Sequence, residues 1–304
     1  MTTSPSADRS GRPAPAARLD LRVAAILTSL CALWGLGQVA VKVGNSGLPP
    51  LLHATFRSAG AALLLTLWCR AQGIRLGGFR NRLLYSATIA GLFAAEFVFI
   101  YWGFVYTTAS RGVLFLYAAP FVVALLAHFV LPEERLTPGR AAGLLCAFGG
   151  LALAFGDGLR LPTHREILGD LLEVVGAIFW GTTTIVIKAY RRPVSPHQTL
   201  FDQLAGSALI LVVLSALTES WTVRATGPVV AAVLYQIVVV AFASYLTWFW
   251  LLTRYPAALM SAFTFWTPIV GLAAGWLILG DPVSPALLGA VILVALGIYL
   301  VNRG

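Results

Sequence analysis

One nine-residue segment occurs twice in this chain, about 146 residues apart. Residues 34–42 read WGLGQVAVK, and residues 180–188 read WGTTTIVIK. The spacing is nearly half of the 304-residue chain, so the sequence predicts two copies of one structural unit. Both copies are almost wholly apolar, and internal duplication of this kind is typical of membrane transporters. The residues that the two segments share are Trp34, Gly35 and Lys42 in the first copy and Trp180, Gly181 and Lys188 in the second.

The composition supports a membrane protein. Hydrophobic residues make up 59% of the chain, charged residues 11%, and the mean hydropathy is +0.84, whereas about a quarter of the residues in a soluble domain are charged. The net charge is +9, but the cations fall between apolar runs and form no basic stripe, so nucleic acid is not an expected partner. The three cysteines lack any metal-ligand or paired spacing, so neither a disulfide framework, a metal site nor a cofactor is indicated.

The chain contains ten apolar runs long enough to span a bilayer. Residues 1–21 are rich in Ser, Pro, Ala and Arg and are expected to form a disordered cytoplasmic tail. The first unit is predicted over residues 22–157 and the second over residues 166–304, with five spans each. The expected spans are Val23–Val43, Leu51–Cys69, Leu83–Thr107, Ser110–Leu131, Gly139–Phe155, Leu168–Tyr190, Thr199–Leu217, Gly227–Leu252, Ala258–Leu279 and Pro285–Val301.

The distribution of Lys and Arg predicts the orientation. If the N-terminus is cytoplasmic, fifteen of the 21 cations fall on the cytoplasmic side and five on the other, and Arg57 alone lies within a span. This bias places both termini in the cytoplasm, with the chain in the plasma membrane. Each unit has an odd number of spans, so the second must cross the membrane upside down. Inverted repeats supply two related conformations, one open to each side, which is the basis of alternating access.

Two prolines occupy matching positions near the middles of the fourth and ninth spans, Pro120 and Pro268. A mid-helix proline removes a backbone hydrogen bond and kinks the helix. In lipid, the bundle or water in a cavity must then satisfy the freed carbonyl. Paired interruptions point to a central site and its gates; a packing kink without functional motion is the alternative.

Five short motifs follow one another along the chain. They are the Trp34–Lys42 helix, the Pro49-Pro50 turn before Phe56-Arg57, residues Tyr106–Arg111, residues Leu131–Thr137, and a glycine-rich fifth span. Their order resembles the drug/metabolite transporter superfamily in its ten-helix EamA branch, over roughly Val23 to Val301. The resemblance implies an all-α polytopic bundle of ten transmembrane helices, arranged as two inverted five-helix repeats, that exports or exchanges small metabolites such as amino acids. It names no substrate.

Two positions depart from the family pattern. Pro132 stands where the family more often has Gly, and Gln203 occupies the second-repeat position equivalent to Arg57. The second departure suggests that the two halves contribute unequally to the site.

Glu96 is the strongest candidate for a functional residue. It lies about thirteen residues into the third span, roughly 20 Å deep. An ionised carboxylate at that depth costs about 3 kcal/mol or more, so Glu96 should face the bundle or a wet cavity. It could carry a proton or bind a substrate ammonium group; a protonated acid used only for packing is the alternative. Its repeat partner is Tyr245.

Arg57 lies six residues inside the second span. It could extend to the interface, or face the cavity to bind a carboxylate or act as counter-ion to Glu96. Gln38, with Thr182–Thr184 at the equivalent place, could supply hydrogen bonds to a ligand or to neighbouring helices. Asp202 and Glu173 lie near span ends and are interpreted as interfacial residues, with a coupling site as the alternative. His53 and His128 lie near interfaces too, and neither is interpreted as a metal ligand.

Aromatic residues crowd the third, eighth and ninth spans. Those at the span ends fit an interfacial belt. Tyr245, Phe263 and Trp266 are deep enough to line a pocket for an amphipathic or aromatic solute; packing is the alternative.

The favoured function is a secondary-active carrier for a small organic metabolite, with export preferred on the resemblance. The sequence contains no Walker motif and no catalytic motif, so an integral membrane enzyme and a non-transporting scaffold are the weaker alternatives. The expected partners are the solute and the lipid bilayer. Coupling to protons or to a counter-substrate stays open, as do the direction of transport and the oligomeric state, a homodimer included.

Overall fold

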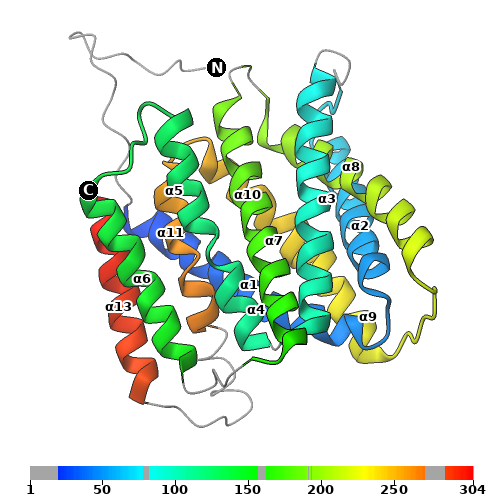
Figure 1. The fold of residues 1–304 in the computed structure, drawn as a ribbon. Coiled ribbons are helices and arrows are strands. Elements are labelled where there is room, and N and C mark those ends of the chain that lie inside the picture. The colour runs from blue at the N-terminus through cyan, green and yellow to red at the C-terminus, as the bar shows by residue number, and fades with distance from the viewer. Residues whose placement is uncertain are drawn as a thin grey trace.

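The structure of the chain is a computed structural model, and it describes residues 20–77, 82–107, 109–156, 162–190, 192, 194–270 and 285–303. Every regular element in these residues is a helix (Figure 1). In chain order the helices are α1 (Leu21–Asn45), α2 (Pro50–Ala71), α3 (Leu83–Tyr106), α4 (Ala109–Leu116), α5 (Ala119–Val130), α6 (Pro138–Gly156), α7 (His164–Ala189), α8 (Pro196–Thr218), α9 (Gly227–Tyr235), the π-helix η2 (Gln236–Ser244), α10 (Tyr245–Leu252), α11 (Ala257–Phe263) and α13 (Pro285–Arg303).

The ten predicted spans correspond to ten apolar helical segments in the described residues. Six are long and apolar enough to cross a membrane: α1, α2, α3, α7, α8 and the continuous run Gly227–Leu252. Four shorter ones lie at Leu114–Val130, Pro138–Leu153, Ala257–Val270 and Gly289–Arg303. The predicted fold class, an all-α polytopic membrane protein, is confirmed. Most of the predicted tail (residues 1–19) and the end of the ninth predicted span (271–279) lie outside the described residues.

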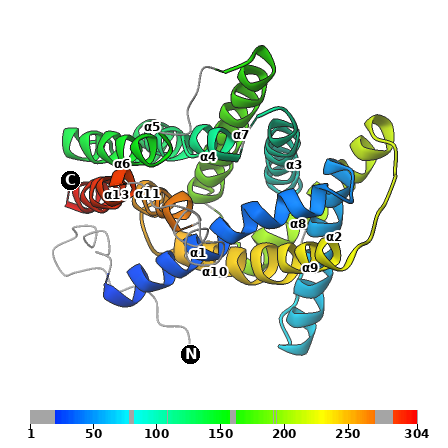
Figure 2. The same ribbon diagram turned by 90° about the horizontal axis from the view of Figure 1, so that it is seen from below.

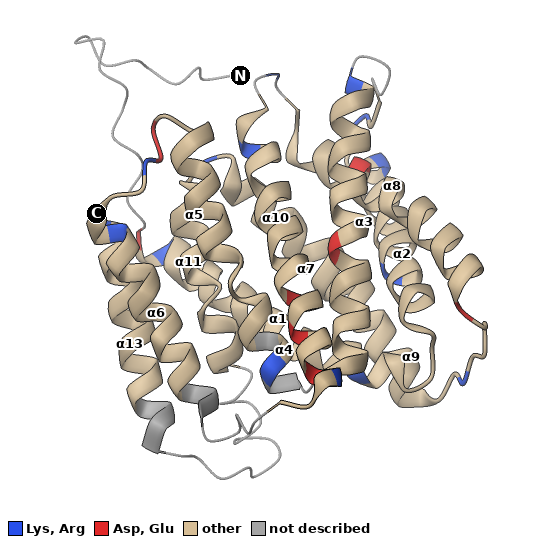
Figure 3. Ribbon diagram, viewed as in Figure 1, with Lys and Arg blue, Asp and Glu red and all other residues tan. Residues whose placement is uncertain are grey.

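Charged residues gather at the two ends of the bundle, and the middles of the helices are almost free of them (Figure 3). Figure 3 shows exceptions on α3 and where α4 meets α7. Large apolar side chains on the outside, such as Leu63, Leu209 and Val213, are more than half exposed. Such a surface suits contact with lipid, where every backbone polar group is satisfied inside the helices.

Local sequence signals explain where several helices begin. Pro50 and Pro196, at equivalent repeat positions, stand in the first turns of α2 and α8, where a proline loses no helical hydrogen bond. The start of α7 has a capping box, because the Thr163 hydroxyl accepts from the Glu166 amide and the Glu166 carboxylate accepts from the Thr163 amide.

The helix packing follows the internal repeat. The third helix of the first unit, α3, packs along the first helix of the second, α7, and the eighth segment packs in the same way along α1. The second helices of the two units, α2 and α8, pack against each other, and so do the fifth helices, α6 and α13. Figure 2 shows α6 and α13 side by side at one edge of the bundle.

Glycines allow the closest of these approaches. A Cβ atom built on Gly297 of α13 would lie 2.5 Å from the carbonyl oxygen of Gly143 on α6, and one built on Gly143 would lie 2.6 Å from the carbonyl oxygen of Gly297. Small residues at such crossings let helix backbones pack closely in a membrane.

Both proline-containing spans are interrupted. The fourth span breaks at Tyr117-Ala118 between α4 and α5, and the ninth breaks at Thr264-Phe265, where α11 ends. Each break contains a tight i to i+3 hydrogen bond, from Ala118 N to Phe115 O (3.1 Å) and from Phe265 N to Ala262 O (3.2 Å). The breaks precede Pro120 and Pro268 by a few residues. A role of these interruptions in gating stays a prediction.

The eighth span is wound differently from its repeat counterpart. Residues Gln236–Ser244 form a π-helix, whereas α3 is a continuous α-helix. Hydrogen bonds tie this span to α1: the Tyr235 hydroxyl donates to Leu33 O at 2.8 Å, and the Gln236 amide donates to Gly37 O at 2.6 Å. π-helical turns are frequent at functional sites, and this one borders the cavity described next.

Candidate functional site

A central cavity lies between helices of both units. Its walls come from α1, α2, α3, the end of α4, α7, α8, η2 and α10. The space between these side chains, including its open mouth, measures about 870 Å³. Concave, mostly apolar sites with a few polar groups are typical of small-molecule binding.

Most of the lining residues form pairs related by the internal repeat. The pairs are Trp34 with Trp180, Gly37 with Thr183, Gln38 with Thr184, Val41 with Ile187, Arg57 with Gln203, Glu96 with Tyr245, and Ile100 with Phe249. The inverted repeat therefore arranges equivalent positions around one shared space. Both charged members of these pairs, Arg57 and Glu96, come from the first unit.

Arg57 reaches the cavity from α2, and only 1% of its surface is exposed. Its guanidinium carbon lies 3.5 Å from the centre of the Phe97 ring and 5.3 Å from that of Phe93. Its Nη1 atom donates to the Tyr245 hydroxyl at 3.5 Å. Its Nε and Nη2 atoms are buried without a hydrogen-bond partner in the described part of the chain. Arg57 thus faces the cavity and does not extend to an end of the bundle.

Glu96 lines the cavity from α3 and is 6% exposed. Within the described residues its carboxylate forms neither a hydrogen bond nor an ion pair. Glu96 and Arg57 line the same cavity, and no ion pair joins them in the described part of the chain. The direct counter-ion pair that the sequence suggested is therefore not formed, although both side chains line one cavity.

Other polar groups around Arg57 also lack partners. Among the described residues, the Tyr101 hydroxyl, the Gln203 side-chain oxygen and His53 Nε2 are buried without a hydrogen bond. Tyr101 and Gln203 line the cavity, and the His53 ring lies 5.5 Å from that of Tyr101. Buried polar groups normally have partners, so the unpaired atoms of Tyr101 and Gln203, which line the cavity, are available to a polar solute.

Aromatic rings form much of the remaining wall. Trp34 meets Trp248 edge-on at 5.1 Å and Tyr245 at 6.1 Å between ring centres. The Trp34 indole donates to the Ser244 hydroxyl at 2.7 Å, which fixes its orientation. The Trp180 ring lies 5.8 Å from that of Tyr117. Such a wall suits an apolar or aromatic group on a solute.

Four of the six predicted binding or coupling residues share this cavity: Glu96, Arg57, Gln38 and Tyr245. The other two lie away from it. The Phe263 side chain is 7% exposed within the apolar core, and its carbonyl accepts from the Cys31 thiol at 3.2 Å. Trp266 packs against the same core. A binding role for the four that share the cavity stays a prediction.

Two segments of the chain, residues 22–156 and 167–303, each match the model of the EamA-like transporter family. The chain belongs to this family. It is therefore an integral multi-pass membrane protein and a transporter of the drug/metabolite transporter superfamily.

Relatives of this EamA-like transporter match it over almost its whole length. An uncharacterized transporter of Bacillus subtilis is 24% identical over 90% of this chain and 94% of its own. A probable amino-acid metabolite efflux pump of Salmonella typhimurium is 28% identical over 88% of this chain and 90% of its own. A probable terminal-alkyne amino-acid exporter of Streptantibioticus cattleyicolor is 25% identical over 89% of this chain and 90% of its own.

One solved structure has the same fold. It superimposes with a TM-score of 0.78 at 19% sequence identity, and the match covers 92% of this chain and 96% of that one.

The two lysines that the repeats of the EamA-like transporter share have different surroundings. Lys188 donates to the carbonyls of Leu252 (2.7 Å) and Tyr255 (2.6 Å) and forms an ion pair with Glu134 at 3.7 Å. The Glu134 carboxylate also accepts from the backbone amide of Ala257 at 2.6 Å, at the start of α11. Lys42 is exposed. One end of the bundle thus carries a network that joins α7, α10 and α11.

Two acidic residues interpreted as interfacial are in fact buried in the transporter. Asp202 is 4% exposed and pairs with Arg82 at 2.9 Å while accepting from Ser86 at 2.6 Å, so it links α8 to α3. Glu173 is fully buried between helices. The sequence gives the distance of a residue from a helix end, but the side of the helix on which it lies depends on packing.

Proposed function

We propose that this transporter exports amino acids, or closely related zwitterions with an apolar side chain, by alternating access. The observation that carries the proposal is that Arg57 and the acidic Glu96 line one aromatic-walled cavity and form no ion pair within the described residues. An α-amino acid offers a carboxylate for Arg57, an ammonium group for Glu96 and a side chain for the aromatic wall.

Arg57 suits the carboxylate because its two free nitrogens are buried. Hydrogen bonds between charged groups are about twice as strong as neutral ones, and a guanidinium without a partner in a dry site is costly. A solute carboxylate would remove that cost. The relatives named as amino-acid efflux pumps and as an amino-acid exporter support the same solute class.

The decisive experiment is counterflow in proteoliposomes. Vesicles loaded with unlabelled L-phenylalanine, a probe with both charges and an aromatic side chain, are diluted into buffer with radiolabelled L-phenylalanine. We expect label to accumulate above the level of protein-free vesicles. Unlabelled L-phenylalanine outside should compete fully, phenethylamine and 3-phenylpropanoate only weakly, because each lacks one charge. Absence of accumulation with phenylalanine, and likewise with leucine and alanine, would contradict the proposal.

The predicted orientation, with both termini cytoplasmic, is tested separately. In a variant with Cys31, Cys69 and Cys146 replaced by Ala, a cysteine is placed at Ser46 or at Gln72; both positions are exposed and lie at opposite ends of α2. A membrane-impermeant maleimide added to intact cells should label Ser46→Cys and leave Gln72→Cys unlabelled. The reverse pattern would show that the chain is inserted the other way.

A further inference from the structure

A buried acidic residue lies outside the cavity, in the contact between α3 and α7. Glu173 of α7 is 0% exposed, and within the described residues neither carboxylate oxygen has a hydrogen-bond partner. It does not line the cavity. The transport cavity described above therefore does not account for it.

The neighbouring helix leaves room for this carboxyl group. A Cβ atom on Gly103 of α3 would lie 2.5 Å from Glu173 Oε1, so the absence of a side chain at Gly103 allows the acid to lie against the α3 backbone. Gly176 lies one turn further along α7, where a Cβ atom would be 2.9 Å from Ile100. The acid is thus enclosed by a close helix contact and not by polar groups.

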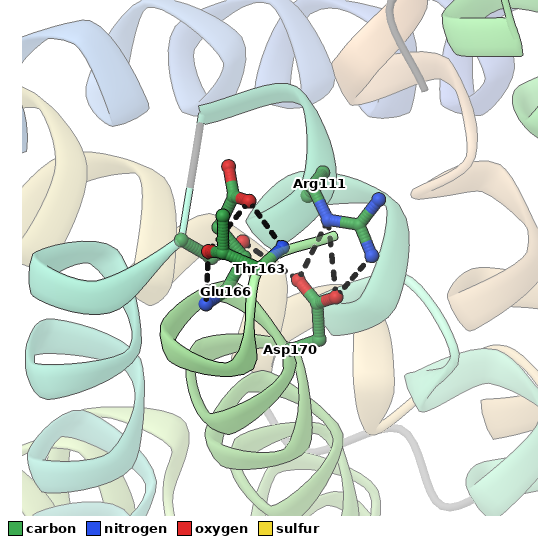
Figure 4. A network of polar contacts seen from close by, with 5 residues as sticks. Arg111, Thr163, Glu166 and Asp170 are labelled. Atoms are coloured by element: carbon green, nitrogen blue, oxygen red, sulfur yellow. Dashed lines mark hydrogen bonds and ion pairs between the residues drawn. The ribbon is translucent and has the colours of Figure 1, made fainter. Parts of the chain in front are cut away.

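The acid one turn earlier on α7 has the opposite environment. Asp170 accepts from the Thr107 hydroxyl at 2.6 Å and from Arg111 Nε at 3.1 Å, and Arg111 Nη2 donates to it as well. Figure 4 shows Arg111 of α4 and Asp170 of α7 facing each other, beside the Thr163–Glu166 capping box. Asp170 is therefore a neutralised anion that joins α4 to α7, with Arg111 as its cation.

The charges around Glu173 can be named element by element. On α7 itself, Asp170 is the acidic residue one turn before Glu173. α4 contributes Arg111, which Asp170 holds. α3 contributes backbone at Gly103 and, seven residues earlier, Glu96, whose carbonyl oxygen lies 3.6 Å from a Cβ atom built on Gly176. The described parts of α5 and α11, which also touch α7, contain one titratable residue between them, His128, near the opposite end of the bundle. An ionised Glu173 would therefore be a second anion beside Asp170 with no cation of its own.

We propose that Glu173 is a proton-binding site, distinct from the substrate cavity, through which a proton gradient drives transport; the proposal rests on the proposed function. In the present conformation the buried group carries its proton, since an uncompensated carboxylate would cost several kcal/mol here. When the α3–α7 contact admits water, Glu173 releases the proton to that side. Its carboxylate then competes with Asp170 for Arg111, because residues three apart on a helix lie on the same face.

This competition links the proton to the cavity. Arg111 holds α4 against α7, and both helices contribute to the cavity wall, through Leu116 on α4 and Trp180 on α7. A change in the Arg111–Asp170 pair would therefore shift the two walls relative to each other. Each cycle moves one proton from one side to the other and leaves Glu173 unchanged.

The test compares Glu173→Gln with the wild type and with Glu133→Gln, in which an exposed glutamate undergoes the same change. Each protein is assayed for phenylalanine counterflow without a pH gradient and for phenylalanine accumulation driven by an acidic lumen. We expect counterflow by Glu173→Gln to stay within about twofold of the wild-type rate. Its gradient-driven accumulation should be at least about tenfold lower than that of the wild type. Glu133→Gln should keep both.

Two outcomes overturn the proposal and leave the proposed function intact: gradient-driven accumulation by Glu173→Gln at the wild-type level, or wild-type counterflow that no pH gradient can drive uphill. Wild-type failure in counterflow counts against the proposed function instead.

The proton site is then tested without a solute. Purified protein in detergent is acidified, and proton uptake is measured with a dye. The pH is kept above about 4.3, because exposed glutamates take up protons near that value. We expect about one proton fewer per chain in Glu173→Gln than in Glu133→Gln. Equal uptake would refute the site.

Discussion

The two repeats surround the cavity with equivalent helices but contribute different chemistry. Positions such as Trp34 and Trp180 keep the same residue, while the charged Arg57 and Glu96 of the first unit face the neutral Gln203 and Tyr245 of the second. Duplication thus explains the symmetric frame, and later divergence explains the site. In such a carrier the fold can be symmetric while both acidic and basic lining residues come from one half.

The largest expected effect comes from making the first repeat resemble the second. Arg57→Gln copies the residue of the equivalent position and removes the cation from the cavity. A hydrogen bond to a charged group contributes about 1.5–3 kcal/mol, so phenylalanine transport should fall about 10- to 100-fold. Initial rates of counterflow give the measurement, with the exposed Arg75→Gln as control.

The double exchange Arg57→Gln with Gln203→Arg sharpens this test. If the repeat positions are equivalent, moving the guanidinium to α8 should restore part of the lost transport. Transport by Arg57→Gln alone at the wild-type rate would mean that the first repeat holds no special role.

The second prediction concerns the contact between α6 and α13, the fifth helices of the two repeats, where Gly143 and Gly297 lie against each other. Gly143→Ala and Gly297→Ala each force a Cβ atom into the backbone of the other helix. Each should lower the free energy of unfolding by a similar amount, about 1–3 kcal/mol, seen as a lower melting temperature in detergent. Gly149→Ala, where no atom lies within 4 Å, is the control and should be close to neutral. Unequal losses for Gly143 and Gly297 would show that this contact is not shared evenly.

A smaller effect on stability is expected at Lys42 and Lys188, the lysines at equivalent positions of the two repeats. Lys188→Met breaks the network with Glu134 and the end of α10 and should lower stability by about 1–2 kcal/mol, because Lys188 is partly buried. Lys42→Met, at the equivalent exposed position, should melt like the wild type. Equal behaviour of the two variants would mean that the network around Lys188 contributes nothing measurable.

The smallest effect on solute preference is expected from a substitution at Trp266. It packs in the core away from the cavity, so Trp266→Ala should leave the relative transport of phenylalanine, leucine and alanine unchanged. Trp248→Ala, which alters the cavity wall, should shift that preference away from phenylalanine. The ratio of initial rates for the three solutes decides between them, and a shifted preference in Trp266→Ala would place Trp266 in the site.

The sequence predicted the frame of the molecule well because the frame depends on local properties. Apolar runs give the spans, and the offset between Trp34 and Trp180 gives the repeat. The repeat alignment pairs Arg57 with Gln203 at an offset of 146 residues and Glu96 with Tyr245 at an offset of 149, and all four residues line the cavity.

The sequence predicted less well which side chains reach the cavity and which are buried between helices, because this depends on the side of the helix from which each one projects. Phe263 and Trp266 are deep in the membrane span, yet the break at Thr264-Phe265 separates them, and neither reaches the cavity. Trp248, in contrast, is not among the residues that the sequence predicts for the site, yet it lines the cavity. The burial of Glu173 depends on Gly103 of another helix, which no periodicity reveals.

The most direct test of unequal recognition by the two repeats is a thermal-shift comparison of wild type, Glu96→Gln and Arg57→Gln. Each protein is heated with L-phenylalanine, phenethylamine or 3-phenylpropanoate, since a ligand that binds the native state stabilises it by RT ln(1 + [L]/Kd). We predict that all three ligands raise the wild-type midpoint, that Glu96→Gln responds to 3-phenylpropanoate but not to phenethylamine, and that Arg57→Gln responds in the opposite way. Equal responses of both variants to both analogues would contradict the account.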